Sequence, residues 1–246
     1  MAKQILFALL ISLSFIATAQ EKIDFSKLGS EDFLATSRKS LLAYSWVKLP
    51  GKIIARPTEG DLIKLPIECS AQLIPNKITF QSIIDKKQNF QTSIQFGKGK
   101  AHSTKILKDY QGEDNFYKKV DIKATDLSLA FMYWDLVNEL EPERLGLSAH
   151  KCRVFRLSNP DADEEYARVW LSQEYLAPVK VEWRRGKISG DADQLLEFKK
   201  FAEVNKVWVP TEIYLKNKTA RIQVRFDKEK INANFSKTLP KDFFLK

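Results

Sequence analysis

The sequence predicts an α+β protein that is mostly antiparallel β, with one large, strongly curved sheet and two helical elements covering its concave face. Segments with strand-like residues and alternation recur at ~10–12 residue spacing between turn residues. Helical periodicity appears in two places, near the start and in the middle of the chain. Because hairpin-length turns join the strand segments, neighbouring strands are expected to pair antiparallel.

The first helix is predicted to begin at Ser30, whose hydroxyl can cap it. Glu31 and Asp32 follow and suit the positive end of the helix dipole. The residues that then recur at helical spacing are Phe33, Leu34, Ser37, Leu41 and Tyr44. The helix is expected to stop before Pro50-Gly51.

Strand patterns fill most of the remaining chain. The segments before the middle helix are residues 52–56, 62–73, 77–84, 90–96 and 103–107. Those after it are residues 151–157, 166–172, 178–184, 195–204, 208–215 and 221–226. Neither a low-complexity linker nor an internal repeat divides the sequence, so one domain is expected.

The second helical candidate is residues 127–135, which Asp126 can cap. This run is unusually apolar and aromatic, and Leu127, Phe131 and Trp134 would share one face. A short turn over residues 135–140 is expected to follow and to end at Pro142.

Residues 1–19 are predicted to be a cleavable signal peptide, which leaves residues 20–246 as the mature domain. Lys3 precedes an apolar run, and Ala17-Thr18-Ala19 forms an A-x-A site, so cleavage is expected after Ala19. The alternative is an N-terminal membrane anchor, but the run is short for one. No Cys follows it to accept a lipid. The mature protein is therefore expected to be soluble and periplasmic.

The chain of 246 residues carries 40 Lys and Arg against 31 Asp and Glu, a formal charge of +9. The basic residues are dispersed and most alternate with acids, as on a solvated surface. The charge also suits an anionic membrane surface or an acidic envelope protein. We expect no nucleic-acid partner, because an exported protein rarely meets chromosomal DNA.

The usual catalytic patterns are missing from the sequence. Its two His residues form no H-E-x-x-H pair, and neither a G-x-S-x-G elbow nor a G-x-x-x-x-G-K-[ST] loop is present. Nine Gly also argue against Gly-rich nucleotide-binding loops. We therefore expect a protein that is not an enzyme, with no catalytic residue, metal or cofactor. An enzyme that uses scattered carboxylates remains the alternative.

Cys69 and Cys152 are the two thiols of the chain, and both lie in strand-like segments. In an oxidising periplasm they can pair, and the bridge would add ~4 kcal/mol of stability in the chain-entropy model. The alternative is two separate buried thiols. No C-x-x-C spacing is present, so a bridge would be structural.

The helical segments carry more apolar side chains than simple capping of a sheet requires. Ordinary core packing explains them, and so does a lined cavity that holds an acyl chain. Met and aromatic side chains suit such a cavity because they adapt to its shape without demanding hydrogen bonds. The candidate lining residues are Leu34, Leu41, Leu127, Phe131, Met132, Trp134 and Trp170.

Residues 30–245 resemble the LolA-like outer-membrane lipoprotein-sorting proteins. The resemblance rests on residues 124–134, 146–157, 166–171, 178–183 and 206–210, which contain the runs ATDLSLAFMYW, KCRV, YARVWL, PVKVEW and KVWVP. These runs combine strands and aromatic residues and include no catalytic signature.

The resemblance implies an incomplete, half-open antiparallel β-barrel closed by helices around a hydrophobic cavity. It also implies a periplasmic carrier of lipid or lipoprotein acyl chains, with no cofactor. Related folds serve as sensors or envelope-assembly proteins, so a non-transporting interaction protein with a filled core is the alternative function.

Overall fold

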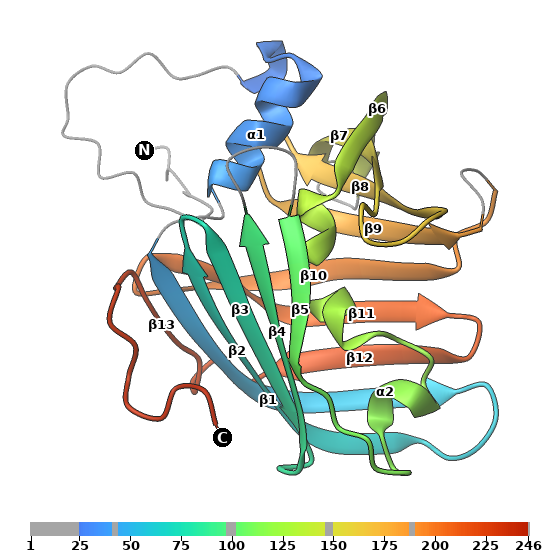
Figure 1. The fold of residues 1–246 in the computed structure, drawn as a ribbon, viewed down its shortest axis with the longest axis vertical. Coiled ribbons are helices and arrows are strands. Elements are labelled where there is room, and N and C mark those ends of the chain that lie inside the picture. The colour runs from blue at the N-terminus through green and yellow to red at the C-terminus, as the bar shows by residue number, and fades with distance from the viewer. Residues whose placement is uncertain (1–24, 41–43, 97–101, 146–149, 187–189, 246) are drawn as a thin grey trace.

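The computed structural model describes residues 25–40, 44–96, 102–145, 150–186 and 190–245 (Figure 1). One antiparallel sheet makes up most of the molecule, and few helices accompany it, which confirms the predicted fold class. The predicted signal peptide lies outside the described residues. None of the helices in the described ranges is long and apolar enough to cross a membrane.

The sheet follows the path β5-β4-β3-β2-β1-β12-β11-β10-β9-β8-β7-β6, and the short strand β13 pairs with β1 beside this path. The first strands are β1 (Ser45–Pro57), β2 (Ile63–Ile74), β3 (Lys77–Ile84), β4 (Gln88–Phe96) and β5 (His102–Lys108). The others are β6 (Asp135–Leu145), β7 (His150–Ser158), β8 (Glu165–Ser172), β9 (Pro178–Arg185), β10 (Gln194–Val204), β11 (Val207–Asn217), β12 (Ala220–Phe226) and β13 (Asn232–Asn234). Because β5 and β6 end the path, the barrel stays open.

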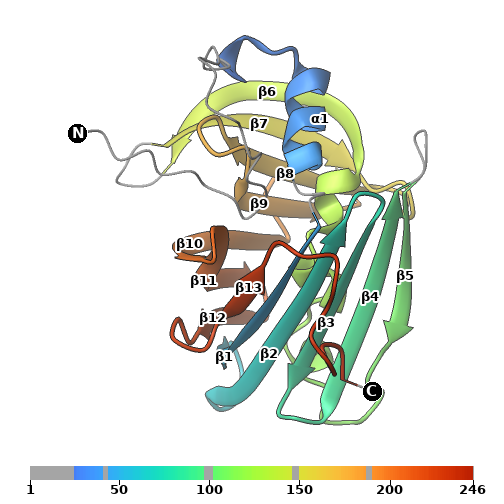
Figure 2. The same ribbon diagram turned by 90° about the vertical axis from the view of Figure 1, so that its left-hand side faces the viewer.

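The long strand β1 joins the two halves of the sheet. It pairs with β2 over Ser45–Ala55, while its first part also pairs with β13 and its last part with β12. In Figure 1 β2–β5 run steeply in front of the horizontal strands β10–β12, and in Figure 2 the two groups lie side by side with β1 between them. The change of partner falls at Gly51, where a Cβ would lie 2.3 Å from the Arg225 carbonyl oxygen. Only glycine allows this approach of β12.

Helix α1 (Ser30–Ser40) begins at the predicted residue but is shorter than predicted. Pro50 and Gly51 do not terminate it, because they lie inside β1. Val47, Leu49 and Ile53 point into the core while Lys48 and Lys52 point outward, and this period of two is that of a strand and not of a helix. Leu41 falls outside the described residues.

The middle helix predicted over residues 127–135 is wrong as a single α-helix. The chain instead forms two short 3₁₀ turns, η2 (Ala124–Leu127) and η3 (Ala130–Tyr133). Leu129 between them has a φ of 62°, in the left-handed region, which interrupts helical hydrogen bonding. Asp126 lies inside η2, where its carboxylate accepts the backbone N–H of Lys123.

The turn predicted over residues 135–140 is also wrong, because these residues belong to the edge strand β6. Its pairing with β7 shifts between Leu140 and Glu143, and this irregularity contains Pro142. A proline is tolerated at such a site, since an edge strand at a bulge needs no N–H there. Four elements of the described ranges lacked a recognised signal: the 3₁₀ turn η1 (Phe25–Lys27), the short helix α2 (Phe116–Lys119), β6 and β13.

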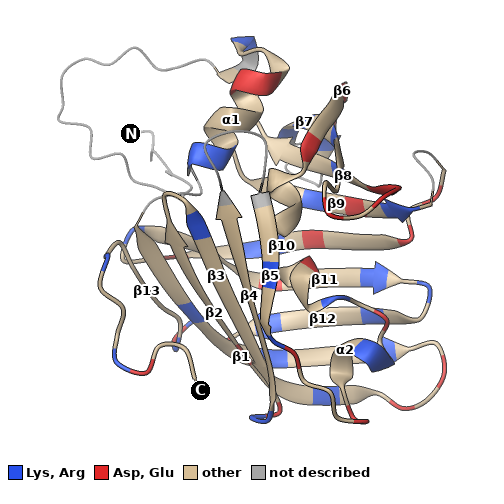
Figure 3. Cartoon of the chain, in the orientation of Figure 1, with Lys and Arg blue, Asp and Glu red and all other residues tan. Residues whose placement is uncertain are grey.

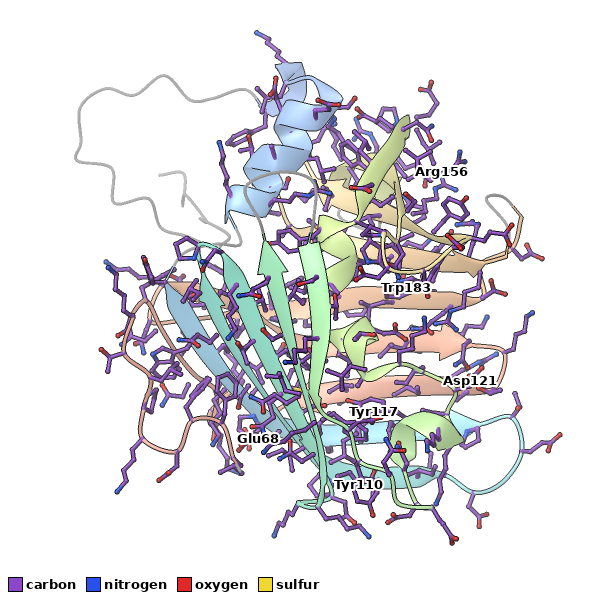
Figure 4. The ribbon with its side chains drawn as sticks, in the orientation of Figure 1. Glu68, Tyr110, Tyr117, Asp121, Arg156 and Trp183 are labelled. Atoms are coloured by element: carbon purple, nitrogen blue, oxygen red, sulfur yellow. The ribbon has the colours of Figure 1, made fainter. Side chains whose placement is uncertain are left out.

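Helices close the concave side of the sheet at two places. Phe33 of α1 stacks on Phe155 of β7, with ring centroids 5.8 Å apart. Helix α2 lies at the opposite end, where the Tyr117 ring packs edge-on against Phe90 of β4 (Figure 4). The Tyr117 hydroxyl also forms a 2.7 Å hydrogen bond with Ser82, and burial raises the pKa of this phenol. The main core lies between these helices and the sheet.

A second, smaller apolar cluster lies on the other face of the sheet. It consists of Cys152, Val154 and Trp170, with Leu140, Leu145 and Val179 packed against them. Cys69 instead belongs to the main core. Each cysteine keeps its thiol, and the predicted bridge between them is not formed. The reason is that alternation places the two side chains in clusters on opposite faces of the sheet.

A half-buried ion pair anchors α1 to the sheet. Arg153 donates from Nε and one terminal nitrogen to the two oxygens of Glu139, over 2.6 and 2.5 Å. It also donates to the Leu28 carbonyl over 2.7 Å and lies 4.5 Å from the Phe33 ring centroid. The hydrogen bonds from Arg153 hold the pKa of Glu139 below its usual range.

Arg153→Leu is expected to lower the free energy of unfolding by ~3 kcal/mol, because Glu139 and the Leu28 carbonyl lose their donor. The wild type should also lose stability as the pH falls below 4.5, the ordinary pKa of Glu139, and the variant should lose less. Urea unfolding at several pH values measures both effects. Removal of the exposed pair Lys230–Asp227 is the control, and an equal loss in that variant would contradict the assignment.

Candidate functional site

An apolar cavity of about 80 Å³ lies between the two halves of the curved sheet. Strands β1–β3 form one wall and β10–β12 form the other, while residues 127–129 cover it. The lining residues are Val47, Leu49, Cys69, Ala71, Leu73, Ile78, Phe80, Leu127, Ser128, Leu129, Phe198, Val209, Pro210, Ile213, Val224 and Phe226. No ionisable side chain other than the Cys69 thiol is among them, and burial raises the pKa of that thiol. The cavity therefore suits hydrocarbon.

The segment that covers the cavity, residues 122–129, is called the lid below. Leu127 and Leu129 line the cavity from the lid and are only partly buried. Asp121 before the lid and Leu129 at its end both have positive φ, 50° and 62°. For a residue such as Leu this conformation is strained by about 1–3 kcal/mol, so the surrounding contacts must hold it. The lid is thus a short piece of chain with left-handed residues at both ends.

One buried carboxylate fastens the lid to the sheet. The Asp126 Oδ2 atom accepts a 2.8 Å hydrogen bond from Gln194 Nε2 on β10 and a 2.9 Å bond from the Lys123 N–H. Asp126 is only 5% exposed, and burial raises its pKa above the ordinary value of 3.8. Asp126 therefore holds the lid through the two hydrogen bonds that its Oδ2 atom accepts. Its negative charge loses hydration in this buried position, which destabilises the ionised form.

Two substitutions of Asp126 separate these effects. Asp126→Ala is expected to cost ~2 kcal/mol, because Gln194 and the Lys123 N–H lose their acceptor. Asp126→Asn keeps an acceptor and removes the charge, so it should leave the neutral-pH stability equal or higher. Because the pKa of Asp126 is raised in the folded state, its ionisation makes the wild type less stable as the pH rises above 3.8. In Asp126→Asn the stability should therefore change less with pH over this range. Urea midpoints from pH 4 to 7 test this; equal losses in both variants would contradict it.

The second 3₁₀ turn holds the lid from its other end. Phe131 packs edge-on against Trp183 of β9, with centroids 5.5 Å apart (Figure 4). Arg38 of α1 donates to the carbonyls of Met132 and Trp134 over 2.7 and 2.5 Å. Phe131, Met132 and Trp134 are buried, so η3 is a fixed support beside the lid.

The predicted lining residues occupy three different places. Leu127 lines the cavity. Leu34, Phe131, Met132 and Trp134 are buried in the main core beside the cavity and are not among its lining residues. Trp170 belongs to the cluster on the opposite face, where its indole N–H donates to Glu143 over 2.9 Å. The predicted residues therefore do not form one site.

Most lining residues come from strands that sequence reasoning did not single out. Ala71, Leu73, Ile78 and Phe80 are inward positions of β2 and β3, and Val209 and Ile213 are inward positions of β11. Period-two alternation identifies such inward positions, but it does not indicate which strands face one another across a curved sheet. The strand order, in which β1 joins β12, supplies the missing information.

No protein-family model matches the sequence, and no curated protein matches it. Solved structures do match. A domain from Vibrio parahaemolyticus, described as an outer-membrane lipoprotein-sorting protein, matches with a TM-score of 0.62 and 15% identity, covering 85% of this chain and 94% of that domain. A LolA superfamily protein from Nitrosomonas europaea matches with a TM-score of 0.53 and 12% identity, covering 89% of this chain and 98% of that one.

The chain has the LolA-like fold. A DUF1329 family protein from Desulfovibrio piger shares it, with a TM-score of 0.62 and 9% identity over 87% of this chain and 94% of the other. The resemblance predicted from the sequence is therefore confirmed at the level of the fold. At these identities the comparisons show the fold alone, and the cargo has to be argued from the residues.

Proposed function

We propose that the protein is a periplasmic carrier that binds an acyl chain of a lipid or lipoprotein between the two halves of its sheet. The observation that carries this proposal is the apolar cavity, which is covered by a strained lid. The LolA-like fold of lipoprotein-sorting and related proteins supports it. In this proposal residues 1–19 direct export, the mature chain begins at Gln20, and the protein performs no chemistry.

The cavity of about 80 Å³ is too small for an acyl chain, so binding requires the lid to move. Withdrawing Leu127 and Leu129 from the cavity would cost less than the ~3–6 kcal/mol of two fully buried leucines, because both are only partly buried. Burial of a chain of about ten methylenes returns ~8 kcal/mol, at ~0.8 kcal/mol for each. The exchange is therefore favourable for a long chain and unfavourable for a short one.

A second candidate function is a non-transporting envelope interaction protein with a filled core. The size of the cavity favours it, because 80 Å³ is the space of only a few water molecules. The two functions differ in whether Leu127 and Leu129 leave the cavity. In the carrier the lid gives way to hydrocarbon, and in the interaction protein it is a permanent part of the core.

Native mass spectrometry of the exported protein distinguishes the two, together with lipid extraction. The carrier should be recovered with bound acyl lipid, and the delipidated protein should take up a fluorescent fatty acid. Leu129→Gly is the companion variant: glycine suits a φ of 62° and removes one side chain from the cavity, so uptake should be faster. Empty wild-type protein and no uptake by either form would establish the filled-core alternative.

A further inference from the structure

Basic side chains are paired with one another across the seam between β1 and β12. Arg56 lies directly opposite Arg221, and Lys52 lies directly opposite Arg225. On the next strand, Lys216 of β11 lies directly opposite Arg221. Figure 3 shows basic residues on all three of these neighbouring strands. The intervening residues Ala55, Ala220, Ile222 and Leu215 point into the core, so the basic side chains share the convex face.

These pairs oppose folding, because like charges directly opposite in an antiparallel pair destabilise it. Within the described residues Arg56, Arg221 and Lys216 form no ion pair. Other basic residues of the same sheet do have carboxylate partners: Lys48 binds Glu68 over 2.9 Å, and Lys200 binds Glu212 over 2.8 Å. The sheet thus pairs basic side chains elsewhere with carboxylates and leaves Arg56, Arg221 and Lys216 without such a partner.

The row borders an open groove of about 750 Å³ at the turn end of these strands. Strand ends and turns form its walls, together with Glu182: residues 56–58, 191–195, 216–218, 220 and 221. Two of its three carboxylates have partners. Glu182 accepts from Lys180 and Arg184, and Asp193 binds Lys218 over 3.6 Å.

The net charge of the side chains that line the groove is therefore positive. Arg56, Arg221 and Lys216 face the one remaining carboxylate, which belongs to the exposed Asp191. Two guanidinium groups side by side present paired donors, a geometry that suits the oxygens of a phosphate group. A compact anion lying between the strands would supply the counter-charge that this row lacks.

We propose that this groove is a binding site for a phosphate-bearing anion, held by Arg56, Arg221 and Lys216. It lies on the opposite face of the sheet from the acyl cavity, so it does not rest on the carrier function. A soluble molecule and a lipid headgroup both offer such a phosphate, and the chemistry of recognition is the same for the two. Lys52 and Arg225 lie outside the proposed site, because Glu212 of β11 is directly opposite Arg225.

The test compares two double variants of the full mature protein. Arg56→Gln/Arg221→Gln removes the row, and Lys48→Gln/Lys200→Gln removes the same amount of charge from paired lysines of the same sheet. Calorimetry with inorganic pyrophosphate at constant ionic strength probes a soluble source. Sedimentation with phosphatidylcholine vesicles, with and without phosphatidylglycerol, probes a headgroup source.

The wild type should bind one of these probes, and the row variant should bind it roughly 20- to 30-fold more weakly, from about fivefold for each arginine. The lysine control should stay close to wild type. The row variant should also melt ~1–3 °C higher, because the like-charge pairs are removed. Pyrophosphate binding identifies a soluble anion, and binding to phosphatidylglycerol vesicles alone identifies a headgroup. Absence of both, or an equal loss in the control, would overturn the proposal.

Discussion

Gly51→Ala is expected to destabilise the protein by ~3 kcal/mol or more, at least as large a loss as that expected for Arg153→Leu. An added Cβ would lie 2.3 Å from the Arg225 carbonyl oxygen and 2.8 Å from the Phe226 Cα. Both neighbours are backbone atoms of β12, so no side chain can rotate away. The strand must shift, and it would take the wall of the cavity at Val224 and Phe226 with it.

Urea unfolding of Gly51→Ala measures this effect, and Gly29→Ala is the matched control. An added Cβ at Gly29 has its nearest contact 3.9 Å away, so the control should stay within ~0.5 kcal/mol of the wild type. If Gly51→Ala proves too unstable to purify, the fraction of soluble protein in the two variants gives the comparison. A Gly51→Ala protein as stable as the control would refute the close approach of β1 and β12.

Ala71→Leu is expected to have the largest effect on ligand binding, lowering fatty-acid affinity at least tenfold. Ala71 lines the cavity from β2, so the longer side chain occupies the space that hydrocarbon needs. Filling an apolar cavity usually keeps or raises stability, by ~0.5–2 kcal/mol. The substitution should therefore separate binding from folding. Titration with a fluorescent fatty acid and urea unfolding measure the two quantities.

Gln72→Leu is the control, because it adds a leucine to the adjacent residue of the same strand. Gln72 is not among the residues that line the cavity, and alternation directs its side chain to the other face. Its fatty-acid affinity should equal that of the wild type. Equal losses in the two variants, or unchanged binding in Ala71→Leu, would show that the ligand binds elsewhere.

The sequence predicts most strands well because strand-like residues recur between turn residues. Lys77–Ile84 is predicted with its observed bounds, and the other predicted strands differ from the observed ones mainly at their ends. The errors have local causes. Pro142 suggests a chain break but lies at a bulge in an edge strand, and Leu129 has left-handed backbone torsions that a leucine rarely adopts.

The candidate site is predicted less well, because it depends on which strands face one another. Leu127 lines the cavity, whereas Trp170 belongs to the cluster on the other face of the sheet. Alternation along the strand shows that Trp170 and Leu171 lie on opposite faces of the sheet. The neighbouring sequence does not show which of these faces is the concave one. The same ambiguity explains the cysteines. Cys69 and Cys152 both lie in strands, and only the assembled sheet shows that they belong to separate clusters.

Photo-crosslinking with a fatty acid that carries a diazirine at the end of its chain tests acyl binding most directly. Peptide mass spectrometry then locates the modified residues on the exported protein. The carrier predicts adducts on cavity residues such as Leu49, Phe80 and Val209, and their loss in Ala71→Leu. Adducts confined to the cluster around Trp170, or cavity adducts that persist in Ala71→Leu, would contradict acyl binding between the two halves of the sheet.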